Sequence, residues 1–257
     1  MHRSLLVIGV ACTTLIAAAP RPRPHPSAGP ECDRHWKPFS VPPETVFATV
    51  KTIALFSPWV EPAVSDSTRQ RGIRAIDSLV QGELHAAGFA SIAPAVADSL
   101  WKAAKDSAGD LYDARTGRAD STKMAAARRV LWRALHERFQ ADALLYLQVR
   151  VVAADFEKWT VTWDGTKQTF GNLGHHFMNA LLHDQYKGRT HALSLVAFLD
   201  DTQGRRLYES RGGLQVSVMP QNGRFVDLPD SVFFADTARN AAAVHIALCH
   251  LVTRGGS

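Results

Sequence analysis

Residues 190–220 read THALSLVAFLDDTQGRRLYESRGGLQVSVMP and give the clearest indication of the architecture. Two runs typical of strands, Leu193–Leu199 and Leu207–Val216, are separated by a short polar connection that contains Gly204. A glycine can take the positive φ that a tight hairpin turn needs, so the stretch predicts two antiparallel strands. Apolar residues at alternate positions of the first strand predict that one face of it is buried. We expect Asp201 to be an exposed turn carboxylate that contributes little to stability.

Hydrophobic periodicity places the other elements upstream and downstream of this hairpin. We expect a buried strand over Ile53–Phe56 and a long strand over Leu144–Val151, with apolar-faced helices between them and after the hairpin. The predicted order is β-α-β-α-α-β-(loop)-β-β-α. The fold class expected is α+β, with a mostly antiparallel sheet of four to five strands and helices mainly on one face.

The N-terminal residues predict export. Residues 1–19 combine one basic residue, Arg3, with a short apolar run that ends in small residues, which is typical of a secretory signal peptide. Residues 20–39 are rich in proline and predict a flexible, extended tether. An alternative reading makes Cys12 the lipid-bearing residue of a bacterial lipoprotein, which would anchor the protein to a membrane without spanning it.

Composition and charge limit what the rest of the chain can be. Residues 40–257 are expected to form a single α/β domain, with a polar insertion at about 105–121 and an irregular Trp/His-rich segment at about 155–189. Of the 29 basic and 24 acidic residues, 5 and 2 precede residue 40, which leaves 24 and 22, a net charge of +2. No run of Lys and Arg with interleaved aromatics occurs, so nucleic acid is not an expected partner.

Two cysteines remain after the leader, Cys32 and Cys249. In an oxidising compartment they can pair if the C-terminal helix packs near the end of the tether. The alternative is one exposed and one buried free thiol.

The segment at 155–189 holds the residues most suited to binding. Trp163, Asp164 and Gly165 are typical of a tight turn, and Trp159 with Trp163 predicts either an aromatic contact surface or core packing. Trp159, Trp163, Asp164 and His176 are therefore the candidate partner-binding residues. An alternative function, a metal-dependent hydrolase or metal-binding protein, would use Asp164 and three histidines of the segment: His175, His176 and His183. On a helix, His176 and His183 lie about 10 Å apart, too far for two ligands of one ion.

Several segments together resemble a known family. TIALFSPW at 52–59, GFASIAP at 88–94, RFQADALLYLQV at 138–149 and LSLVAFLDDTQGRRLYESRGG at 193–213 are similar to the bacterial periplasmic lipoproteins related to the curli-secretion lipoprotein and the N-terminal domain of TolB. The resemblance covers residues 49–252. It implies a cell-envelope α/β domain that binds other proteins or assembles, with no catalytic residues to carry over.

The sequence thus predicts a non-catalytic cell-envelope protein with a binding or assembly role. We expect it to be exported to the periplasm or the periplasmic face of the outer membrane. Its expected partner is an envelope protein or a second copy of itself, and membrane contact is expected only through a lipid anchor. No nucleophile elbow, phosphate-binding loop or His-Glu-x-x-His motif occurs, so the sequence predicts no catalytic residue, metal or cofactor.

Overall fold

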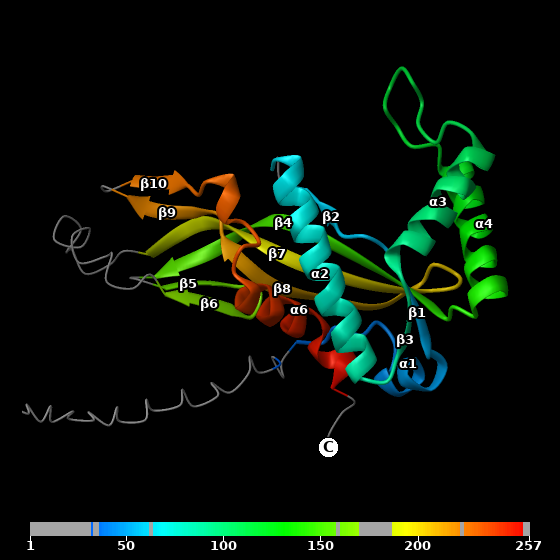
Figure 1. Ribbon diagram of the computed structural model, residues 1–257, viewed down its shortest axis with the longest axis horizontal. Coiled ribbons are helices and arrows are strands. Elements are labelled where there is room, and N and C mark those ends of the chain that lie inside the picture. The colour runs from blue at the N-terminus through cyan, green and yellow to red at the C-terminus, as the bar shows by residue number, and fades with distance from the viewer. Residues whose placement is uncertain are drawn as a thin grey trace, which may run out of the picture.

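A computed structural model describes residues 32, 36–61, 64–157, 160–169, 187–221 and 224–253. Figure 1 shows long strands crossing the molecule, with helices over them and at one end. The helices and strands, in chain order, are α1 (Pro43–Thr49), β1 (Thr52–Leu55), β2 (Trp59–Val60), α2 (Asp66–Ala86), β3 (Ala90–Ile92), α3 (Pro94–Ala108), α4 (Ser121–Phe139), β4 (Ala143–Glu157), β5 (Thr160–Trp163), β6 (Thr166–Thr169), β7 (Lys187–Asp201), β8 (Arg206–Val216), β9 (Val218–Gln221), β10 (Arg224–Asp227), the 3₁₀ turn η2 (Asp230–Val232) and α6 (Thr237–Val252).

The sheet is mixed, so the prediction of a mostly antiparallel sheet is wrong. Strand β1 pairs in parallel with both β3 and β4, and β2 pairs in parallel with β4. Antiparallel pairing joins β4 to β7 and β7 to β8 along nearly their whole lengths. The sheet has eight strands instead of four to five, and β9–β10 forms a separate ribbon. Helices α2 to α4 connect the parallel strands, and the hairpins connect the antiparallel ones.

Helices α2 and α6 cover one face of β4, β7 and β8. Ile76, Val80 and Leu84 recur every four residues along α2, and all three have no exposed surface. They pack with the odd-numbered apolar residues of β4 and β7 in the largest core cluster. Gly212 of β8 allows α6 to approach closely, because a Cβ at that position would overlap the backbone carbonyl oxygen of Ala243.

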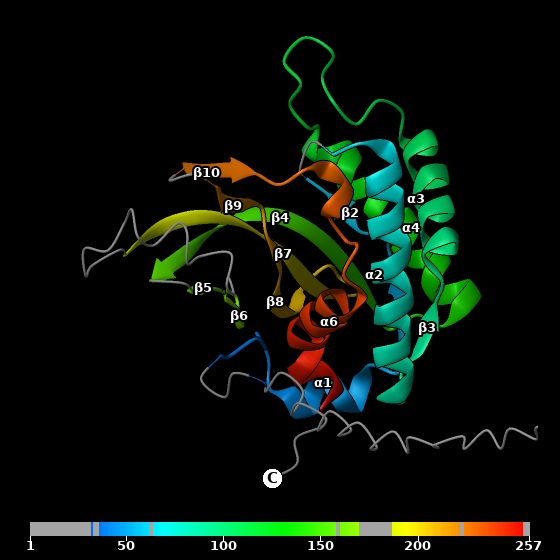
Figure 2. The same ribbon diagram turned by 60° about the vertical axis from the view of Figure 1, so that its left-hand side comes forward.

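Helices α3 and α4 cover the opposite face at one end of the sheet, so the expectation of helices mainly on one face is also wrong. Ala54 and Leu144 point away from α2 and pack with Ala97 of α3 and with Leu131 and Leu135 of α4. Figure 1 and Figure 2 show this helix pair at the end of the molecule away from β9 and β10. No helix in the described part of the chain covers the rest of this second face.

At the far end, the β5–β6 hairpin folds back onto β8. The indole Nε1 of Trp163 donates to the carbonyl oxygen of Leu193, at 3.0 Å, and the hydroxyl of Thr166 donates to the carbonyl oxygen of Gly213, at 2.9 Å. The resulting curl encloses a third apolar cluster that includes Phe156 and Trp163. The described residues of 155–189, expected to be irregular, belong mainly to strands: the end of β4, β5, β6 and the start of β7.

The β7–β8 hairpin turns at Gly204, which has φ +78° as the sequence predicts. Asp201 is not the exposed carboxylate expected there, since its side chain is 14% exposed. Its Oδ1 accepts the backbone N–H groups of Gln203 and Arg205 at 2.8 and 2.9 Å. Burial alone would raise the pKa of Asp201, but these hydrogen bonds and the Arg205 side chain hold it below its ordinary value.

Two expected segment boundaries also shift. The polar insertion begins later than residue 105, because α3 continues to Ala108 and only 109–120 form a loop before α4. At the end of the expected tether, Pro38 accepts a hydrogen bond from the backbone N–H of Glu209 at the edge of β8, and the next residue but one, Ser40, donates to the carbonyl oxygen of Leu207. No helix in the described part of the chain is long and apolar enough to cross a membrane.

Candidate functional site

The second face of the sheet forms the floor of a groove beside α4. Tyr146 of β4 pairs with Phe198 of β7, and Gln148 and Arg150 follow Tyr146 on the same side of β4. Because side chains alternate along a strand, these residues face away from the core that α2 and α6 cover. All four are only partly buried and line a hollow of about 590 Å³.

The walls of this hollow come from four other parts of the chain. The β1–β2 connection supplies Phe56, β2 supplies Trp59, α3 supplies Trp101, and α4 supplies Arg128 and Trp132. Arg128, Trp132 and Gly204 also line a second hollow of about 930 Å³, which continues along α4. We call the two hollows together the arginine groove. Its rim carries the exposed Trp59, 54% of whose surface is accessible.

The arginine groove is strongly cationic. Its lining contains five arginines, a histidine and one carboxylate: Arg128, Arg129, Arg133, Arg150, Arg206, His136 and Asp200. Of the arginines, only Arg206 forms ion pairs with described residues, namely Asp200 and Glu209. Four guanidinium groups are thus left without a described acidic partner, and each offers several N–H donors to a ligand.

Stacking fixes the aromatic floor. Phe56 and Tyr146 stack with ring centroids 5.0 Å apart and planes 5° apart. The guanidinium carbon of Arg206 lies 4.2 Å from the ring centroid of Phe198, and that of Arg150 lies 5.8 Å away. Such cation–π contacts orient both guanidinium groups. Arg206 also donates to Asp200 and Glu209, whereas Arg150 has no described acidic partner and keeps its N–H groups available to a ligand.

The pKa of the Tyr146 phenol is set by burial and by the charged groups of the arginine groove. Burial, together with the nearby Asp200, raises the pKa of Tyr146 to about 12, although Arg128 and Arg206 act to lower it. The phenol therefore stays protonated at every physiological pH and is a hydrogen-bond donor in the groove. Close to it, the buried Oε1 of Gln148 accepts no hydrogen bond from the described residues.

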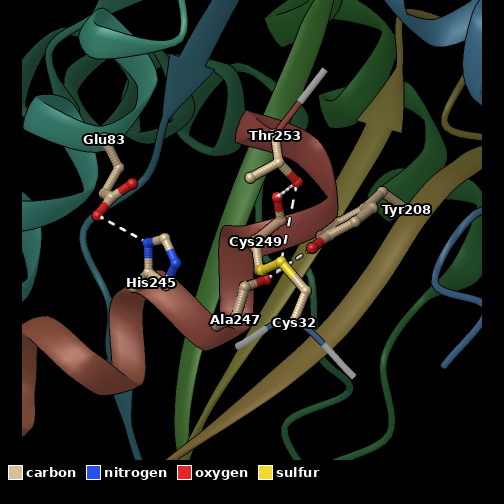
Figure 3. Close-up of a disulfide and its surroundings, with 7 residues drawn as sticks. All are labelled: Cys32, Glu83, Tyr208, His245, Ala247, Cys249 and Thr253. Atoms are coloured by element: carbon tan, nitrogen blue, oxygen red, sulfur yellow. Dashed lines mark hydrogen bonds and ion pairs between the residues drawn. A yellow bond between two sulfur atoms is a disulfide. The ribbon is translucent and has the colours of Figure 1, made fainter. Parts of the chain in front are cut away.

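A disulfide joins Cys32 to Cys249 on α6, with the two Cα atoms 5.7 Å apart (Figure 3). Thr253 donates its hydroxyl to the carbonyl oxygen of Cys249 at 2.6 Å, and Tyr208 donates to that of Ala247 at 2.8 Å. The end of α6 is thus tied both to the N-terminal segment and to β8. Of the two alternatives for these cysteines, the structure shows the paired one.

The residues expected from the sequence to bind partners do not form a described site. Trp163 is buried and 6% exposed, which corresponds to the packing alternative. Asp164 lies in the β5–β6 turn with φ +38° and accepts a hydrogen bond from the buried hydroxyl of Ser194. Trp159 and His176, together with His175, His183 and Cys12, lie outside the described residues.

The described residues give no metal site. No group of three or more His, Cys, Asp or Glu side chains among them is close enough to hold an ion. His245 pairs instead with Glu83 of α2, with Nδ1 3.3 Å from Oε1 (Figure 3). The metal-binding alternative depends on histidines that lie outside this part of the chain.

Little in the sequence indicates the arginine groove. Arg128, Arg150 and Arg206 come from α4, β4 and β8, and they come together only through the pairing of β4 with β7, the pairing of β7 with β8 and the packing of α4. The available signal was the polar alternation of Tyr146, Gln148 and Arg150 along an otherwise apolar strand. That alternation marks a face left open by the core.

Comparisons with known proteins are sparse. No family model matches the chain, and no curated protein matches it. Among solved structures, the lipoprotein GNA1162 from Neisseria meningitidis is 16% identical with a TM-score of 0.32, covering 64% of this chain and 81% of its own. A PelC dodecamer from Paraburkholderia phytofirmans is 14% identical with a TM-score of 0.33, covering 80% and 91%. At these identities no site residue carries over from either structure.

Proposed function

We propose that this protein is an exported, non-catalytic binding protein of the cell envelope, and that it holds its partner in the arginine groove. The observation that carries the proposal is the groove itself, where four arginines without a described acidic partner surround an aromatic floor. Arginine and aromatic side chains are the residues most enriched at the centres of protein interfaces. The unpaired guanidinium groups favour a partner that supplies the missing negative charge.

Two observations support export. The first nineteen residues have the pattern of a secretory signal, and the disulfide between Cys32 and Cys249 belongs to an oxidising compartment. Mass spectrometry of protein recovered from the envelope should find a mature chain that begins at Pro20. A chain that begins with a lipidated Cys12 would replace the signal-peptidase reading by the lipoprotein one, and a chain that retains Met1 would contradict export.

Partner binding is tested by photocrosslinking in the intact envelope. A photoreactive phenylalanine derivative replaces Trp59 on the rim of the groove in one variant. The matched variant carries it at Trp36, which is 46% exposed and does not line the groove. We expect the Trp59 variant to form a defined crosslinked product that the Trp36 variant lacks. Crosslinking at Trp36 alone would move the binding surface away from the groove and contradict the proposal.

A further inference from the structure

We infer that the occupant of the arginine groove is an acidic peptide segment of a partner protein. This inference rests on the proposed function and names the chemistry of the ligand. The charge count is its first support: five arginines and one histidine stand against one aspartate in the lining. A segment that carries several carboxylates would neutralise the four guanidinium groups that no described acid pairs with.

The basic residues of the groove are arginines, not lysines, and this favours a ligand that carries carboxylate groups. Among the described residues, no lysine lines either hollow. The guanidinium group is planar and presents two parallel N–H donors, which match the two oxygens of one carboxylate. Arg128 stands on the wall that α4 forms, and Arg150 stands on the floor that β4 forms. A chain with several carboxylates along it would bond to both the wall and the floor.

The aromatic floor disfavours an acidic polysaccharide. Sugar rings bind by stacking on an open aromatic face, but Phe56 and Tyr146 already stack on each other. Phe198 is covered by the guanidinium group of Arg206. Each of these floor rings therefore has one face already covered, and the exposed ring at the groove is that of Trp59 on the rim.

The test measures binding of fluorescein-labelled decapeptides to the mature chain by fluorescence anisotropy. The acidic probe has five Glu-Ala repeats, the uncharged control has five Gln-Ala repeats, and polygalacturonate serves as the carboxylated polysaccharide. We expect the acidic peptide alone to bind, and its affinity to fall as NaCl rises from about 0.05 M to about 0.5 M.

Matched double variants locate the binding. Arg128→Gln with Arg150→Gln removes two charges inside the groove, and the affinity should fall by about tenfold or more. Arg74→Gln with Arg138→Gln removes two charges from exposed positions that line neither hollow, and the affinity should change by about twofold or less. Circular dichroism and the melting temperature establish that both variants fold.

Three results would overturn the inference: equal losses in the two double variants, equal binding of the Gln-Ala peptide, or binding of polygalacturonate through Arg128 and Arg150 in place of the acidic peptide. Absence of any binding by the acidic peptide would overturn it as well. In each case the Trp59 crosslink decides the proposed function separately. If the crosslinked partner binds through a segment that is not acidic, the proposed binding function stands and the inference of an acidic ligand is wrong.

Discussion

The close approach of α6 to β8 at Gly212 predicts a large destabilisation from one added methyl group. In Gly212→Ala the new Cβ would overlap the carbonyl oxygen of Ala243 and lie 3.0 Å from the backbone nitrogen of Ala247. Both obstacles are helix backbone, which no rotamer change can move. To restore ordinary contact distances, α6 must shift by about 1 Å from the sheet, which weakens the packing of Val244 and Leu248. We expect a cost of about 3 kcal/mol, the upper end for overpacking.

The control is the same substitution at Gly82, an exposed position of α2 where a Cβ would meet nothing within 4 Å. Gly82→Ala should stabilise the protein by up to about 1 kcal/mol, because alanine favours the helix. Thermal unfolding followed by circular dichroism should show a melting temperature lower by about 6–12 °C for Gly212→Ala and higher by about 2–4 °C for Gly82→Ala. If Gly212→Ala has the same melting temperature as the wild-type protein, the packing of α6 on β8 described above is wrong.

Four further variants test other parts of the fold. Replacing Cys32 and Cys249 together by serine should lower the free energy of unfolding by about 2–5 kcal/mol, because the disulfide joins residues 217 positions apart. In urea unfolding, adding reductant should destabilise the wild-type protein and leave the double variant unchanged. Burial and the nearby Asp98 raise the pKa of Asp77 in the folded protein to about 6 from an ordinary 3.8. Between these two values the folded state binds a proton that the unfolded state does not bind. The free energy of unfolding should therefore fall as the pH rises from about 4 to about 6. Asp77→Asn should flatten that fall in melts taken at pH 4 and pH 7, and an unchanged profile would contradict the assignment. At the β7–β8 turn, Gly204→Val should lower the free energy of unfolding by about 1–3 kcal/mol, because residue 204 has a positive φ. Asp201→Ala should lower it by about 1–2 kcal/mol, because two backbone N–H groups lose their acceptor. A large difference between the melting temperatures of the two variants would contradict one of these two causes.

The strands and helices of this protein could be predicted where the pattern is local. The β7–β8 hairpin, the α2 periodicity and the glycine of the turn all follow from residues close together in the sequence. Parallel pairing could not be predicted in the same way, because β1 is four residues long and is buried on both faces. Its apolar run is compatible with either direction of pairing, and the intervening helix α2 sets the direction.

Side-chain contacts between distant segments set the rest. The weak net charge of the folded part concealed the groove, because acidic and basic residues balance in number while the arginines gather on one face. Asp201 is a local exception, because the two backbone N–H groups that it binds, those of Gln203 and Arg205, belong to the same turn. In the segment at 155–189, Trp163 became a core residue once the hairpin curled onto β8.

The bond between Cys32 and Cys249 has a mechanical consequence. Tension on the chain ahead of Cys32 passes through a covalent link to α6, near its last turn. Without the link, the same tension would fall on the hydrogen bonds of Pro38 and Ser40 at the edge of β8, which would open one after another. A domain pulled by its N-terminal end therefore keeps that edge closed. Under traction, the strands that support the groove hold their spacing.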